Sequence, residues 1–204
     1  GFWVMFGAIA ELVDRSKLGR IPLGESWRRL KGLPRTAFST ALGHFGLGVT
    51  VIGIVVTTAW QSELITTVGT GETVTLNGYQ VQLVKLDEDV PGPNYTADHG
   101  EFVITAPNGG KREAVAERRT YIASGQPTTE ASIQTYGFSQ LYLQLGEDEA
   151  AGRHVLRVWF KPYVTLIWLG ALLMSGAGFL SLSDRRLRVG APKPRRTPAL
   201  EAAQ

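Results

Sequence analysis

The sequence predicts a membrane α-helical fold combined with an all-β domain, in which transmembrane helices flank a small antiparallel β barrel or sandwich outside the membrane. Two observations lead to this prediction. The apolar residues of the 204-residue chain are concentrated in blocks rather than distributed in amphipathic periods. Between the last two blocks, residues 61–162 contain short alternating segments separated by turn dipeptides, which is the pattern of an antiparallel β domain.

The chain opens within an apolar run that lacks the basic start and the small-residue cleavage site of a signal peptide. We therefore interpret residues 1–13 as the end of a transmembrane helix in the C-terminal piece of a longer polytopic protein. Residues 14–36 are strongly basic and are interrupted by Gly and Pro. They are predicted to form a basic cytoplasmic loop with a brief interfacial helix at 25–31.

Residues 37–60 are predicted to form a transmembrane helix that carries His44, because no Asp, Glu, Lys or Arg occurs from 37 to 59. An ionisable residue inside such a run is a candidate functional residue. Neutral imidazole is a common ligand of haem iron, so His44 is a candidate axial ligand. Ala41 and Gly48 lie one turn on either side of His44 and leave space for a flat macrocycle to approach the backbone.

Other interpretations of His44 remain open at this point. It could relay protons, or it could hydrogen-bond a neighbouring helix while the nearby glycines allow close helix packing. A haem with two histidine ligands needs a second histidine, and the chain offers only His99 and His154. Both lie in the predicted external domain. The second ligand would therefore belong to a part of the protein outside this chain or to another chain.

Charge predicts the orientation of the β domain. Residues 61–162 contain 13 Asp or Glu and 8 Lys or Arg, a net charge of −5, whereas residues 1–60 and 163–204 each carry +4. Because cytoplasmic segments of membrane proteins are enriched in Lys and Arg, both flanks are predicted to be cytoplasmic and residues 61–162 to be periplasmic. Residues 163–182 are predicted to form another transmembrane helix, and residues 183–204 a basic, disordered cytoplasmic tail.

Alternating residues predict about seven strands within the β domain. The dipeptide Asn77-Gly78 predicts a two-residue hairpin turn between two of them. The turn-rich segment 91–100 predicts a loop in which His99 is solvated, and His154 is predicted to begin a strand without a functional role. The predicted strands are 72–76, 79–86, 100–106, 114–122, 131–136, 140–145 and 154–160.

Several function classes find no support in the sequence. The absence of cysteine excludes a disulfide framework and a Cys-based metal site. The chain contains neither a nucleophile elbow nor a phosphate-binding glycine loop. Basic residues flank the membrane segments, which argues against nucleic-acid binding. Charged residues at 117–121 and 128–130 predict either an ion-pair patch for a partner protein or an ordinary solvated face.

Several motifs together resemble one known family. The order of the elements and the motifs are similar to the C-terminal end of the CcmF/NrfE cytochrome c maturation proteins, over about residues 1–188. The motifs that carry the resemblance are 43–54 (GHFGLGVTVIGI), 92–94 (GPN), 127–133 (PTTEASI), 141–147 (LYLQLGE), 157–162 (RVWFKP) and 167–170 (IWLG).

The resemblance implies that the full-length protein is a polytopic inner-membrane subunit of the bacterial haem lyase. Such a subunit receives haem from a periplasmic haem chaperone. With partner subunits that present apocytochrome c, it promotes covalent attachment of the haem to apocytochrome c. The resemblance also implies an integral haem b held by two transmembrane histidines, and His44 matches the more C-terminal of the two.

Other features of the family have no counterpart in this chain. They are a tryptophan-rich periplasmic segment, the two histidines that flank it and the other haem b ligand. The resemblance assigns no catalytic residue to these 204 residues. A function from a different class also fits, namely a membrane-anchored assembly scaffold or transport subunit whose β domain docks partner proteins. In that case His44 only packs against a neighbouring helix.

Overall fold

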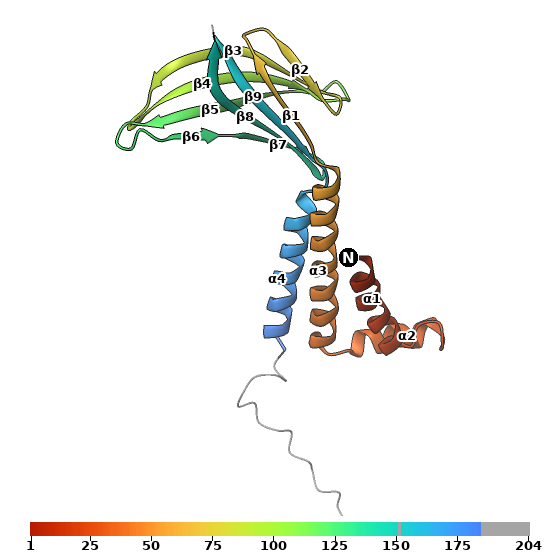
Figure 1. The fold of residues 1–204 in the computed structure, drawn as a ribbon. Coiled ribbons are helices and arrows are strands. Elements are labelled where there is room, and N and C mark those ends of the chain that lie inside the picture. Colours follow the sequence, from red (N-terminus) through yellow and green to blue (C-terminus); the bar gives the residue numbers. More distant parts are fainter. Residues whose placement is uncertain (151, 185–204) are drawn as a thin grey trace, which may run out of the picture. The chain divides into compact units, whose positions relative to one another are not determined.

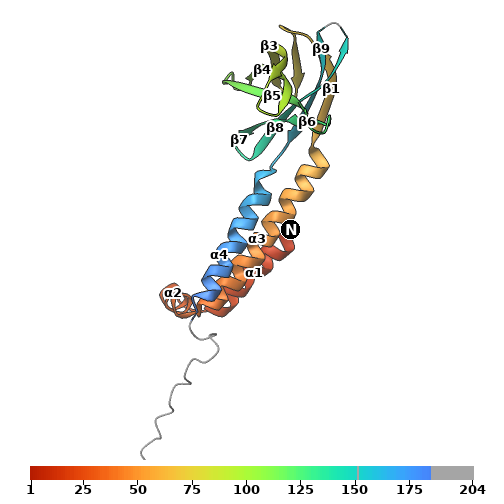
Figure 2. The same cartoon turned by 90° about the vertical axis from the view of Figure 1, so that its left-hand side faces the viewer.

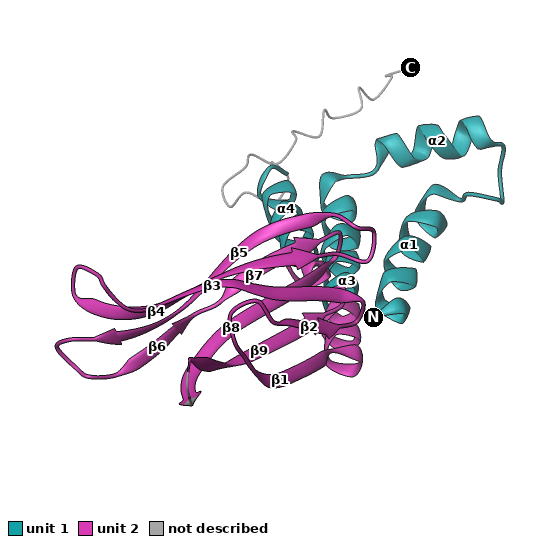
Figure 3. Cartoon of the chain, turned by 90° about the horizontal axis from the view of Figure 1, so that it is seen from above, with its two compact units in different colours: residues 1–50, 169–204 teal, residues 51–168 magenta. Residues whose placement is uncertain are grey.

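The computed structural model describes residues 1–150 and 152–184, which contain four helices and nine strands (Figure 1). It divides into two compact units (Figure 3). Unit 1 comprises residues 1–50 and 169–204, and unit 2 comprises residues 51–168. Of the tail predicted at 183–204, residues 185–204 lie outside the described part. The helices are α1 (Phe2–Ser16), α2 (Leu23–Gly32), α3 (Arg35–Trp60) and α4 (Thr165–Leu182).

Helices occupy more of the N-terminal region than the sequence predicts. Helix α1 continues three residues beyond the predicted end at 13, and it stops where Lys17 adopts the left-handed conformation with φ 55°. Helix α2 includes the short helix predicted at 25–31 and adds residues on both sides. The basic segment 14–36 is therefore largely helical, because its Gly and Pro residues fall mainly at the helix ends, and its cytoplasmic location stays a prediction.

Helices α3 and α4 confirm the two uninterrupted apolar helices that the sequence predicts. Both are long and apolar enough to cross a membrane by length and composition, with a mean hydropathy of 1.7 in each. Helix α3 begins at Arg35, directly after Pro34, a residue that suits a helix start because it has no N–H to leave unpaired. Helix α4 begins three residues after Pro162.

Glycines allow the two apolar helices to approach each other closely. In unit 1, a Cβ atom added to Gly46 would lie 2.8 Å from the Gly170 carbonyl oxygen, and one added to Gly170 would lie 2.5 Å from the Gly46 carbonyl oxygen. In unit 2, a Cβ atom added to Gly53 would lie 2.9 Å from the backbone nitrogen of Ile167. Small residues at such contacts are typical of helices that pack in membranes.

Unit 2 contains an antiparallel β-sandwich (Figures 1 and 2), which is one of the two architectures that the sequence predicts. One sheet has four strands in the order β1-β9-β8-β7, and the other has five in the order β2-β3-β4-β5-β6. The strands are β1 (Ser62–Val68), β2 (Thr73–Leu76), β3 (Tyr79–Pro91), β4 (Tyr95–Thr105), β5 (Lys111–Tyr121), β6 (Pro127–Glu130), β7 (Ser132–Tyr136), β8 (Ser139–Ala150) and β9 (Arg153–Lys161).

The seven predicted strands are all present, but β1 and β6 were not predicted. All four residues of β6 are exposed, so no alternation of buried and exposed side chains marks it. The segment 91–100 is not a loop, because β3 continues to Pro91 through two irregularities in its pairing and β4 already begins at Tyr95. The hairpin at Asn77-Gly78 is confirmed, with φ values of 49° and 80° that suit a two-residue turn.

Large apolar side chains from both sheets fill the core. Phe102 and Ile104 from β4 pack with Leu141 and Leu143 from β8, and all four are buried. Burying each such side chain stabilises the fold by roughly 1.5–3 kcal/mol. Near one end of the core the ring of Tyr79 lies 4.9 Å from that of Tyr136. The sandwich therefore has a core of its own between its two sheets.

Candidate functional site

Helix α3 places His44 on an exposed part of its surface. The neighbours Thr40 and Leu47, four residues before and three residues after, are exposed as well, because these spacings put side chains on one face of a helix. Among the residues that the structure describes, none donates a hydrogen bond to the imidazole or accepts one from it. A polar ring thus lies without a protein partner on an apolar helix.

Ala41 and Gly48 lie on a different part of the surface of α3. Both are buried, and they face α1 in unit 1. A Cβ atom added to Gly48 would lie 2.9 Å from the carbonyl oxygen of Gly1 and would overlap the side chain of Met5. The space that the sequence predicts beside Gly48 is therefore occupied by the first turn of α1.

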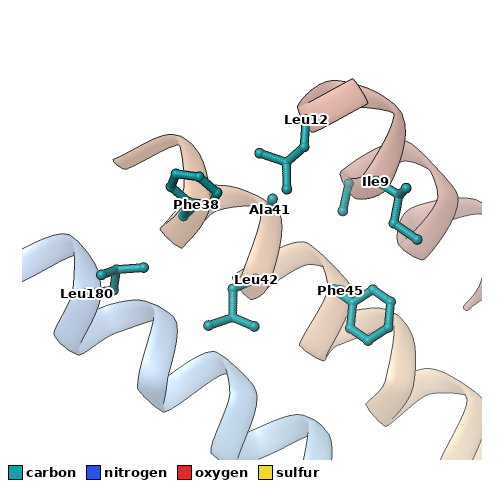
Figure 4. A pocket seen from close by; sticks show the side chains of 8 residues that line it. Ile9, Leu12, Phe38, Ala41, Leu42, Phe45 and Leu180 are labelled. Carbon is teal, nitrogen blue, oxygen red and sulfur yellow. The ribbon is translucent and has the colours of Figure 1, made fainter. Parts of the chain in front are cut away.

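Free space borders Ala41 instead. An apolar cavity of about 280 Å³ is lined by residues of α1, α3 and α4, and Figure 4 shows Ala41 beside Leu12 of α1. Phe45 lines the same cavity from the next turn of α3, whereas His44 is not among the lining residues. The structure thus places the imidazole and this cavity on different sides of α3.

The chemistry of His44 fits haem iron. An unpaired imidazole nitrogen is the ligand that haem proteins most often present. In a helix without Asp, Glu, Lys or Arg between 37 and 59, no neighbouring cation or carboxylate of α3 competes for that nitrogen. In the described part of the chain, no group of three or more His, Cys, Asp or Glu side chains is arranged to hold a metal ion.

The sandwich brings His99 into a charged cluster that the sequence did not predict. His99 lies within β4 and pairs with Glu117 of β5, and its Nδ1 donates a hydrogen bond of 2.6 Å to Glu117 Oε1. Arg119 donates from Nε to Glu117 Oε2 at 2.7 Å and lies 3.3 Å from Glu130 of β6. The prediction of a solvated loop histidine is therefore wrong, because the register of β4 and β5 places His99 opposite a carboxylate.

Ion pairs of Arg119 with Glu117 and Glu130 join the segments 117–121 and 128–130, and their use by a partner protein stays a prediction. The hydrogen bond from His99 lowers the pKa of the Glu117 carboxyl below its ordinary value, and Arg119 lowers that pKa further. Glu117 in turn raises the pKa of the Arg119 guanidinium. Glu117 and Arg119 therefore stay charged at neutral pH.

His154 is the third histidine, and it is buried. It is the second residue of β9, its side chain is 1% exposed, and its Nε2 lies 3.1 Å from Glu88 Oε1 of β3. The position near the start of a strand is as predicted. The contact of His154 with Glu88 was not predicted, because it joins strands from the two sheets and has no local sequence signal.

Comparisons with known proteins address the family. A sequence-family model described as the CcmF C-terminal beta-sandwich matches residues 59–162. The chain belongs to the CcmF family. This confirms the family that the motifs predicted, and the matched range covers every strand of the sandwich.

Individual relatives agree with this assignment. The cytochrome c-type biogenesis protein CycK of Rhizobium meliloti is 47% identical over 202 residues, which are 98% of this chain and 30% of the relative. The cytochrome c-type biogenesis protein CcmF of Pseudomonas aeruginosa is 33% identical and is matched over 92% of this chain and 28% of its own length. The chain thus spans about 30% of the length of the curated relatives it matches.

A solved structure supports the fold of this CcmF-family chain. The cytochrome c heme lyase CcmF superimposes with a TM-score of 0.64, at 14% sequence identity, over 90% of this chain and 34% of that chain. At this identity the likeness concerns the fold alone. It supports the combination of a β-sandwich with apolar helices that the sequence predicts.

Proposed function

We propose that this chain is the C-terminal part of an integral-membrane haem lyase subunit for cytochrome c maturation. Its membership of the CcmF family and the names of its relatives, which are cytochrome c-type biogenesis proteins, support this function. In such a subunit, haem is taken from a periplasmic haem chaperone and attached to apocytochrome c. The chain itself supplies a helix pair and a β-sandwich to that larger protein.

The proposed location is the bacterial inner membrane. Helices α3 and α4 span the bilayer, the sandwich lies in the periplasm, and the basic flanks lie in the cytoplasm. The length and apolarity of both helices support this arrangement. So does the alternation of net charge, +4 before the sandwich, −5 within 61–162 and +4 after it, which is the asymmetry expected from the positive-inside rule.

His44 is proposed as one axial ligand of an integral haem b. The observation that carries this proposal is an exposed imidazole without a protein partner on an apolar helix. When bound, haem b would supply an iron that exchanges one electron. The residues of this chain would hold the neutral imidazole toward the iron from a rigid helix, and Leu47 on the same face would exclude water. The second ligand would come from outside this chain.

The position of Ala41 and Gly48 refines this proposal. Because α1 occupies the space at Gly48, the macrocycle would approach over the exposed face that Thr40, His44 and Leu47 share. Ala41 is buried against α1 and lines the apolar cavity, so it would not border the group. The small side chains at both positions would then serve the contact between α3 and α1 rather than the haem.

Spectroscopy of the full-length protein tests the role of His44. We expect His44→Gly to lower haem affinity by about tenfold or more and to change the reduced-haem absorbance. Added imidazole should restore the absorbance, because it can occupy the vacated ligand position. Val55→Ala, at another exposed position of α3, is the matched control and should retain the haem. Unchanged haem content and absorbance in His44→Gly would eliminate His44 as a ligand.

A scaffold that docks maturation partners is the second candidate function. The charged cluster around Glu117 on the outer face of the five-stranded sheet favours it, because such networks can fix the register of a partner. In this case His44→Ala should leave the yield of cytochrome c near normal, because His44 forms no hydrogen bond with the described residues of this chain.

Docking is tested separately from ligation. We expect a complex that lacks residues 61–162 to recover less haem chaperone or maturation subunit in a pull-down than the intact complex does. Undiminished recovery would count against docking by the sandwich, and it would leave the proposal for His44 unaffected.

A further inference from the structure

The turn between β7 and β8 carries an exposed phenylalanine that does not belong to the hydrophobic core. Phe138 follows Gly137, whose φ of 61° closes the turn, and its side chain is 55% exposed. The ring is not part of the core cluster between the two sheets. A single exposed apolar side chain is common on protein surfaces, whereas a group of them indicates an interaction surface, so the neighbours of Phe138 decide its role.

Hydrogen bonds fix this turn to the start of α4, within unit 2. The carbonyl oxygen of Phe138 accepts from the backbone nitrogen of Thr165 at 3.2 Å and from Thr165 Oγ1 at 2.9 Å. The backbone nitrogen of Tyr163 donates to Ser139 Oγ at 3.3 Å. The backbone of Phe138 is therefore held beside the first turn of α4, and Figure 2 shows the β7–β8 turn next to that helix end.

Three more exposed aromatic side chains lie at the same helix ends. Trp60 ends α3 and is 65% exposed, Tyr163 precedes α4 and is 50% exposed, and Trp168 in the first turn of α4 is 67% exposed. Together with Phe138 they form what we call the aromatic collar. Aromatic side chains are enriched at the boundary between hydrocarbon and headgroups. There the apolar part of the ring contacts hydrocarbon while neighbouring polar groups stay in contact with water.

The charges of unit 2 are arranged to match an anionic lipid surface near the collar. The segments 60–62, 136–140 and 161–168 contain Lys161 and no Asp or Glu, and the next acidic residue, Glu63, is paired with Arg157. The acidic residues 147–149 lie at the opposite end of β8, about 30 Å along the strand from Phe138 at the usual rise per residue. Anionic headgroups attract lysine and repel carboxylates, so this end of the sandwich suits a bilayer surface.

We propose that the aromatic collar is a lipid-binding surface, and that the ring of Phe138 inserts into the headgroup region of the bilayer. This inference rests on the proposed function, because it requires that α3 and α4 span that bilayer. The β7–β8 turn then acts as a second attachment of the sandwich to the membrane, in addition to its two covalent junctions with the helices.

Single-cysteine labelling tests the insertion, since the chain has no native cysteine. Three variants of the full chain, Phe138→Cys, Ile54→Cys and Ala123→Cys, each receive a nitroxide label in vesicles of phosphatidylethanolamine and phosphatidylglycerol. Collisions of the label with oxygen, which concentrates in lipid, are compared with collisions with a water-soluble nickel chelate. Ile54 is an exposed residue of α3, and Ala123 is an exposed residue of the β5–β6 turn.

We expect the oxygen-to-nickel ratio at Phe138 to exceed that at Ala123 several-fold and to fall below that at Ile54. A ratio at Phe138 equal to that at Ala123 would overturn the inference while a high ratio at Ile54 upholds the membrane span. A low ratio at Ile54 would instead overturn the span proposed for α3. Shielding of Phe138 from both reagents would mean that a protein covers the ring, which also overturns lipid binding.

A second variant keeps an aromatic ring in place, in case the cysteine variant does not fold. Phe138→p-benzoylphenylalanine is irradiated in the full-length protein in its own membrane. We expect adducts with phospholipid, identified by mass spectrometry. Adducts with protein, or no adduct, would overturn the inference. The same substitution at Ala123 is the control and should give no phospholipid adduct.

Discussion

Glu117 is the residue through which the charged cluster of the sandwich contributes to stability. Its carboxylate accepts hydrogen bonds from His99 and Arg119, and its side chain is 18% exposed. Both neighbours lower the pKa of Glu117 in the folded state. Between the two pKa values, the folded state therefore binds fewer protons at this position than the unfolded state does. The stabilisation is present above the unfolded pKa of about 4.3 and is lost as pH falls through the lower folded pKa.

We therefore expect Glu117→Gln to lower the free energy of unfolding of the sandwich by about 1–2 kcal/mol at pH 7. As pH falls through the unfolded pKa and then the lower folded pKa of Glu117, the difference from the unmodified chain should shrink, because the carboxylate becomes protonated. Urea denaturation followed by circular dichroism of the detergent-solubilised chain, repeated from pH 3 to pH 7, measures both values.

Glu113→Gln is the matched control for this measurement. Glu113 lies on the same strand, β5, is exposed, and forms no ion pair among the described residues. Its substitution should change the stability by less than about 0.5 kcal/mol at every pH. Equal effects of the two substitutions would contradict the role assigned to Glu117.

The three histidines show which properties of a single residue can be predicted from the sequence and which cannot. His44 was identifiable because its apolar surroundings in the chain are themselves the signal. The contacts of His99 and His154 depend on strand register and on packing between sheets. Their partners lie 18 and 66 residues away in the sequence, and no local pattern specifies which residue stands opposite.

At the scale of elements, α3 and α4 depend on backbone contact at glycines. Gly170 meets Gly46 and Thr50 so closely that a single methyl group has no room, whereas the Cβ position at Gly176 on the same helix has no atom within 4 Å. Gly170 and Gly176, two of the three glycines of α4, therefore have different roles. One permits helix packing, and the other imposes only the low helix propensity of glycine.

We expect Gly170→Ala to destabilise the helix pair by about 1–3 kcal/mol through overpacking. Gly176→Ala should be neutral or stabilising by up to about 1 kcal/mol, because alanine favours the helix. Thermal unfolding of both variants in detergent compares them directly. Destabilisation of similar size in the two variants would refute the close contact as the cause.

Elements with a strong periodic or apolar pattern were predicted, and the others were not. Apolar runs identified α3 and α4, and alternation identified seven strands. Strand β6 exists because it pairs with β5 from Glu117 to Thr120, a tertiary contact without a pattern of its own. Strand β1 begins two residues after α3 ends, and its inward side chains include a threonine at 66, which weakened the apolar alternation.

At the scale of the whole molecule, the proposed topology places the acidic sandwich and the basic α1–α2 region on opposite sides of the membrane. The net charges of −5 for 61–162 and +4 for 1–60 support it. Ala123 in the sandwich and Lys31 in α2 are both exposed, so each offers a position for labelling.

We expect a membrane-impermeant maleimide to label Ala123→Cys in spheroplasts and to label Lys31→Cys only after the inner membrane is broken. The positive-inside rule gives this direction, and gel mobility of the labelled chain measures it. Labelling of both positions in intact spheroplasts would contradict the topology. Labelling after lysis serves as the control that each cysteine is reactive.

The pairing of β1 with β9 has a consequence for how the sequence of this protein can evolve. Ser62 stands opposite Phe160 at the point where the chain enters and leaves the sandwich, and Thr57 Oγ1 donates to the Pro162 carbonyl at 2.8 Å across the same junction. The two ends of the sandwich therefore meet at the helix junction. We expect that the sandwich can be exchanged for that of a relative without separating the pair of helix ends. Substitutions on the surface of the sandwich can then accumulate independently of those in the helices.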